Sequence, residues 1–133
     1  MPPSIKIQMD MFDLLKADNE LNAVISGCAY DWVPEDASFP YVSFGPMELI
    51  RDTGGVTIYQ QLDIWSRASG RAECSRVSDL VTNAILRGNR NVIIPTAEIV
   101  HKGTIILTDP DGLTSHGIVS FVTFIEQASA QGG

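Results

Sequence analysis

The sequence predicts an α+β fold, in which an antiparallel-dominated β-sheet of four or more strands carries two main α-helices packed on one face. Three observations indicate this fold class. Two long β-type runs, Tyr41 to Arg51 and Val56 to Ser66, flank a Gly-Gly pair, which is typical of an antiparallel hairpin. An amphipathic helix, Ala72 to Leu86, follows at once. The last β-type run, Gly117 to Glu126, is apolar on both faces, as expected of a central strand.

The chain begins with a helical segment over residues 1–27. We expect Ser4 to cap a first helix that ends near Ala17. Its apolar positions are three and four residues apart and form one face: Ile7, Met11, Leu14 and Leu15. Asp18 or Asn19 begins a second helical turn, which Gly27 ends.

A short strand and a loop connect this segment to the hairpin. The strand is expected over Cys28 to Asp31, and the prolines and polar residues of Pro34 to Pro40 predict a loop. In the second hairpin strand, one face is mostly apolar and the other is mixed. This alternation predicts a sheet covered by helices on one side only.

The hairpin forms a long arm with Gly54 and Gly55 at its tip. We expect the apolar side chains near the tip to lie beyond the reach of the chain's own core. Exposed apolar residues of this kind mark a partner surface. The residues expected at a subunit interface are Met47, Leu49, Ile50, Val56, Ile58 and Tyr59.

The helix that follows the hairpin carries a single apolar stripe: Cys74, Val77, Leu80, Val81, Ala84 and Ile85. Gly88 is expected to stop this helix. Three short β-type runs come next: Val92 to Ile94, Glu98 to His101 and Thr104 to Thr108. Residues 128–133 are small and polar, which predicts a flexible tail.

Length and composition favour one ordered domain over residues 1–133. The 133 residues are close to the commonest domain size, and 44% are hydrophobic. Nine Lys and Arg against 16 Asp and Glu give a net charge of −7, which argues against a duplex-DNA-binding protein. No signal-peptide pattern and no membrane-length apolar window occurs, so we expect synthesis in a reducing cytoplasm, no membrane contact and free thiols at Cys28 and Cys74.

The chemically suggestive residues have simpler explanations. The Asp109 to Gly112 segment lacks the further oxygen ligands of a calcium loop, and a β-turn accounts for it. His101 and His116 have no further soft ligands nearby, and Ser115 and Asp111 are too close in sequence to His116 for a catalytic relay. We therefore expect no enzyme activity and no catalytic, cofactor-binding or metal-binding residues.

The order of these pieces resembles the tail-completion, or tail-terminator, family of long-tailed (siphovirus-like) phages and of phage-derived particles such as gene transfer agents. The segments that carry the resemblance are Ala29-Tyr30, Pro34 to Pro40, Phe39 to Phe44, Gln61 to Ser66, Ala72 to Leu86 and Ile118 to Glu126. The match spans nearly the whole chain in the right order. Residues 92–111 are the departure, because this region is too variable in such proteins to be interpreted by resemblance.

The resemblance implies a structural virion protein at the head–tail junction, made in the cytoplasm of the bacterial host. Subunits would form a homo-oligomeric ring, six-fold in relatives, that caps the tail tube and stops its polymerisation. The partners implied are the tail tube protein and the head–tail connector or neck protein, and the first helix is a candidate for those contacts. DNA would pass through the ring without tight binding.

Two other functions remain open at this stage. One is a different neck or head-completion protein of the same particle. The other is a small cytoplasmic enzyme or ligand-binding domain that uses the concave sheet face.

Overall fold

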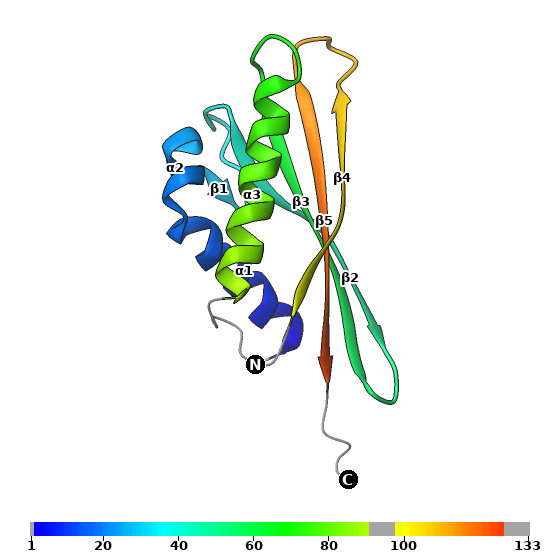
Figure 1. Cartoon of the computed structure of the whole chain (residues 1–133). Helices are drawn as coiled ribbons and strands as arrows, with labels where there is room; N and C mark the ends of the chain where they lie inside the picture. Colours follow the sequence, from blue (N-terminus) through cyan, green and yellow to red (C-terminus); the bar gives the residue numbers. More distant parts are fainter. Residues whose placement is uncertain (1, 91–97, 127–133) are drawn as a thin grey trace.

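The computed structural model describes residues 2–90 and 98–126 (Figure 1). The elements in chain order are α1 (Pro3–Ala17), α2 (Asn19–Ile25), β1 (Ala29–Tyr30), β2 (Tyr41–Arg51), β3 (Gly55–Ser66), α3 (Ala72–Arg90), β4 (Ile99–Thr108) and β5 (Ser115–Glu126). Two expectations, the β-type run Val92 to Ile94 and the flexible tail over residues 128–133, lie outside the described residues.

The strands form one sheet in the order β1-β2-β3-β5-β4. Only β1 and β2 are parallel, and the other three pairings are antiparallel. The helices lie together on one face, with α3 in front of the central strands (Figure 1). The α+β fold class is confirmed, and the described residues form three helices, of which α1 and α3 are the long ones. The central position of the last strand, between β3 and β4, is also confirmed.

The start of α1 differs from the prediction. The helix begins at Pro3, and Pro2 occupies the N-cap position without a side-chain hydrogen bond, so the Ser4 cap is wrong. Proline suits the first turn of a helix because its missing N–H would have no partner there. The second helix starts as expected, because the Asp18 carboxylate accepts a hydrogen bond of 2.9 Å from the Leu21 N–H.

Helix α3 does not stop at Gly88, as predicted, but continues to Arg90. A Cβ atom at Gly88 would collide with the side chain of Leu14 on α1. The glycine therefore permits the close approach of two helices instead of ending one of them.

The expected runs Glu98 to His101 and Thr104 to Thr108 are a single strand, β4. Its register with β5 shifts between His101 and Gly103. Such an irregularity bends a strand without ending it, which explains why the pattern suggested two pieces.

The core lies between the helices and the sheet. The predicted α3 stripe is confirmed, since its members are buried except for Leu80, which packs against the core while partly exposed. Phe121 of β5 is the largest fully buried side chain. Strand alternation sends every second side chain of β3 and β5 to this side, and the opposite face of the sheet stays free of helices (Figure 1).

Candidate subunit-docking face

The uncovered face of the sheet carries large apolar side chains that nothing in the described chain covers. Their strand neighbours point into the core. Val56 and Ile58 flank Thr57, which pairs with Ile50, and Phe121 and Thr123 flank Val122, which pairs with Val100. Five such residues are each between 46% and 57% exposed and come from β2, β4 and β5. We call them the sheet-face patch: Ile50, Val100, Ile105, Leu107 and Phe124.

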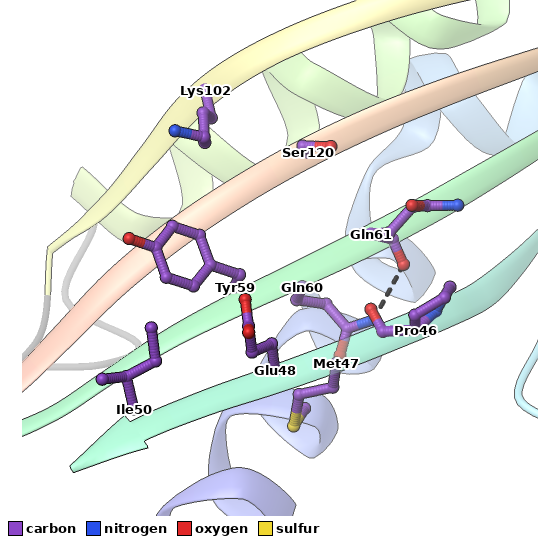
Figure 2. Close-up of a pocket in the computed structure, with 9 residues that line it drawn as sticks. All are labelled: Pro46, Met47, Glu48, Ile50, Tyr59, Gln60, Gln61, Lys102 and Ser120. Atoms are coloured by element: carbon purple, nitrogen blue, oxygen red, sulfur yellow. Dashed lines mark hydrogen bonds between the residues drawn. The ribbon is translucent and has the colours of Figure 1, made fainter.

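The hairpin arm contributes a shallow hollow to this face. It has a volume of about 430 Å³, and Met47, Ile50 and Tyr59 line it together with Lys102 of β4 (Figure 2). The Lys102 ammonium lies 5.5 Å from the centre of the Tyr59 ring, close enough for a cation–π contact. Two of the six predicted interface residues, Ile50 and Tyr59, thus lie together on the uncovered face, whereas Met47 borders the hollow but packs against the core.

The other three predicted residues are not exposed as expected. Val56 and Ile58 are 0% and 1% exposed, and Leu49 packs against the core. The prediction that they lie beyond the reach of the core is wrong because β3 pairs with β5 along its whole length. The arm is therefore part of the sheet, and alternation turns these side chains to the helix-covered side.

A buried glutamine shapes the rim of the hollow. The register between β2 and β3 shifts between Phe44 and Met47. At that point the side-chain amide of Gln60 donates to the backbone oxygen of Gln61 at 2.7 Å (Figure 2). It also donates to the backbone oxygen of Gly45 at 3.2 Å. Because Gln60 is only 2% exposed, these bonds satisfy an amide that would otherwise be costly to bury.

Next to the patch lies a polar cluster that the sequence analysis missed. His116 Nε2 lies 2.8 Å from Asp63 Oδ1, and the His116 ring stacks on Trp65 with centroids 3.8 Å apart. Gln61 donates to the same Asp63 oxygen at 2.9 Å. Asp63 and Trp65 share one face of β3 in the alternation, but only the register with β5 places His116 beside them.

The histidines do not share a site. His101 Nε2 lies 2.8 Å from Thr104 Oγ1, whereas His116 contacts Asp63. Over residues 2–90 and 98–126, no group of three or more His, Cys, Asp or Glu side chains is placed to hold a metal ion. Within the same ranges, no helix is long and apolar enough to cross a membrane.

The Asp109 to Gly112 segment is a turn, as predicted. The Gly112 N–H donates to the Asp109 carbonyl oxygen at 2.9 Å. The Asp111 carboxylate accepts hydrogen bonds from the backbone N–H groups of Leu113, at 2.8 Å, and Thr114, at 2.9 Å. A carboxylate used in this way closes the loop between β4 and β5.

We expect the Asp111→Asn variant to lose part of the acid sensitivity of the fold. Hydrogen bonds from the Thr114 and Leu113 N–H groups and the Thr114 hydroxyl lower the pKa of Asp111 from its usual 3.8. A lowered pKa means that the carboxylate stabilises the fold above pH 3.8 and that this contribution disappears as the pH falls through the lower native value. Melting temperatures of parent and variant between neutral and strongly acidic pH measure the difference. Parallel curves would contradict the assignment, and stabilisation of the parent by Ca²⁺ would point to a metal loop.

Three comparisons relate the whole chain to known proteins. The family described as "Tail completion protein gp17" matches residues 9–126. A chain from the solved structure "Virion of native gene transfer agent (GTA) particle" superposes with a TM-score of 0.76 at 20% sequence identity, covering 90% of this chain and 94% of that one. At this identity the superposition establishes a shared fold. No curated protein matches the sequence.

Proposed function

The chain belongs to the tail completion protein gp17 family, and from this membership we propose that it caps the tail tube as a closed ring. It is a structural protein of the virion tail. In the proposed role, a homo-oligomeric ring, hexameric by resemblance, sits on the last ring of tube protein, stops tube polymerisation and offers its other face to the head–tail connector. The role is assembly, and we assign no catalytic residue.

The observation that carries this proposal is the sheet-face patch. A family member that works alone would expose five large apolar side chains to water on a surface that its own helices leave bare. A closed ring with head-to-tail contacts covers such a surface in every subunit and leaves no free end that would grow into a fibre. The arm residues Ile50 and Tyr59 then lie at the subunit contact.

The charge of the chain suits the passage of DNA. A net charge of −7 leaves few Lys and Arg to neutralise phosphates, which is the source of tight binding to nucleic acid. We propose that the genome passes through the ring without adhering to it.

The Ile50→Asp variant is expected to remain folded and to lose ring formation. Ile50 is 47% exposed, so a carboxylate is tolerated in the monomer but is buried without a partner in the ring. That burial costs about 3–5 kcal/mol, or roughly a 100- to 4,000-fold loss of association. Native mass spectrometry gives the oligomeric state, and electron microscopy of tube protein polymerised with each variant gives the tube lengths.

Leu113→Asp provides the matched control, since Leu113 is an exposed apolar residue in the β4–β5 turn, outside the patch. The parent and this control should form rings and limit tube length, whereas tubes should keep growing with Ile50→Asp. A parent that binds the head connector and leaves tube growth unchanged would identify a different neck protein. A parent that stays monomeric both alone and on tubes would overturn the ring.

A further inference from the structure

A second apolar surface lies on the outer side of α1. Ile5 and Met9, one helical turn apart, are 49% and 50% exposed, and Phe12 continues the stripe. The core uses the opposite side of this helix, so core packing does not explain the exposed Ile5 and Met9. Met9, Phe12 and Asp31 line a hollow of about 260 Å³. Trp32, which is 89% exposed, is the next residue in the chain after Asp31. We call this surface the helix patch: Ile5, Met9, Phe12 and Trp32.

The helix patch and most of the sheet-face patch lie toward opposite edges of the sheet, although Ile50 of the sheet-face patch belongs to β2. Phe12 packs against Phe44 of β2, with ring centroids 6.4 Å apart, so the helix patch runs beside the β2 edge. Three of the five residues of the sheet-face patch, Val100, Ile105 and Leu107, belong to β4 at the other edge. Surfaces at opposite edges suit head-to-tail contact, in which each copy presents one patch to each neighbour.

The charges beside the patches are complementary. Asp13 and Asp31 line the hollow of the helix patch, and among the described residues neither has an ion-pair partner. Lys102 is exposed on β4 between Val100 and Ile105, with its ammonium over the Tyr59 ring, and it forms no ion pair with a carboxylate of residues 2–90 or 98–126. Opposite charges placed in this way fix the register of two docking surfaces.

The size of the sheet face also fits a subunit contact. The four long strands have 10 to 12 residues each. At ~3.3 Å per residue and ~4.8 Å between strands, the face measures roughly 35 by 19 Å, about 700 Å². A standard interface buries about 800 Å² on each partner.

We propose that the sheet-face patch of one copy docks on the helix patch of the next copy, with Lys102 facing Asp13 and Asp31 across the contact. This inference rests on the proposed ring and specifies how it is built. Trp32 is the anchor of the helix side, because a large exposed indole is the side chain best suited to fill a hollow on a partner. Ile105, the most exposed residue of the sheet-face patch, is the anchor of the sheet side.

The test mixes two variants that are damaged on different patches. Ile105→Asp spoils the sheet-face patch and Met9→Asp spoils the helix patch; both residues are at least half exposed, so both variants should fold. Each variant alone should be monomeric. In a 1:1 mixture, the intact helix patch of Ile105→Asp meets the intact sheet-face patch of Met9→Asp, and a dimer without higher species is expected by native mass spectrometry.

A zero-length carbodiimide cross-linker reports the same contact even when it is short-lived. With Ile105→Asp labelled with ¹⁵N, the mixture should give cross-linked peptides that join Asp13 or Asp31 of the labelled chain to Lys102 of the unlabelled chain, and not the reverse pair. The parent should give the cross-link between its own copies, and Leu113→Asp should behave as the parent.

The outcomes separate this pairing from the ring itself. A parent that forms rings while either variant also does so, or while the mixture gives neither dimer nor cross-link, overturns the pairing and leaves the ring. A Met9→Asp variant that forms rings but no longer binds tubes assigns the helix patch to the tube, which also overturns the pairing. A parent that is monomeric alone and on tubes overturns both proposals.

Discussion

Replacing Phe121 with alanine is expected to lower the free energy of unfolding by about 3–5 kcal/mol. Phe121 is 0% exposed and lies in the middle of β5, the strand that joins β3 to β4. Truncation removes its apolar contacts and leaves a cavity that the surrounding strands and helices cannot fill. Domains of this kind are stable by about 5–15 kcal/mol, so the variant should be close to unfolding at room temperature. Equilibrium urea denaturation measures the loss.

Phe124→Ala is the matched control, with the same substitution three residues further along the same strand. Phe124 is 46% exposed and lies on the uncovered face, so most of a Phe→Ala core penalty does not apply. Its loss should be about 1 kcal/mol or less in the monomer. Equal losses for the two variants would contradict the assignment of the two faces of β5.

Gly55→Ala is expected to destabilise the chain by about 2–4 kcal/mol, because it combines backbone strain with a collision. Gly55 has a φ of +156°, and a Cβ atom there would collide with the backbone oxygen of Ile125 and crowd the backbone of Glu126. Since those atoms belong to β5, the arm has to separate from its neighbour to make room. Denaturation gives the overall loss, and hydrogen exchange at Thr57 and Phe124, which pair across the two strands, gives the local opening.

Gly54→Ala tests the same turn without the collision. A Cβ atom at Gly54 would meet nothing closer than 3.6 Å, at the Asp52 carboxylate that accepts hydrogen bonds from both glycine N–H groups. We expect a change within about 1 kcal/mol, in the stabilising direction if the unfolded chain loses more freedom than the turn does. A large loss here would show that the tip, and not the approach of β5, sets the requirement for glycine.

Local patterns were enough to predict much of the fold. The alternation of β3, the Gly-Gly tip and the stripe of α3 each depend on residues that are close together in the sequence. All three appear in the structure as predicted. The role of Gly88 was predicted wrongly because local patterns do not report contacts with a distant helix. A glycine near the end of a helix is a common stop signal, and only the position of Leu14 on another helix shows that it serves close packing.

The candidate site was only half visible in the sequence. Ile50 and Tyr59 were predicted at the interface and do lie on the uncovered face, whereas Val56 and Ile58 do not. The exposure of these six residues depends on the face of the sheet that each occupies and on whether another strand pairs beside the hairpin. The second condition depends on β5. The patch residues of β4 were missed, because that strand read as two pieces and its apolar side chains had no assigned face.

The sequence by itself determined the fold class, the order of the elements and the family, because turn chemistry, periodicity and motif order are properties of neighbouring residues. Only the tertiary structure decided which apolar residues of the arm are buried, which apolar residues lie on the uncovered face of the sheet and that Asp63 meets His116, 53 positions along the chain. The physical reason is register. When β3 pairs with β5 and β4 joins at the edge, each side chain is assigned to the covered or the uncovered face, and a shift of one residue in that pairing would exchange them.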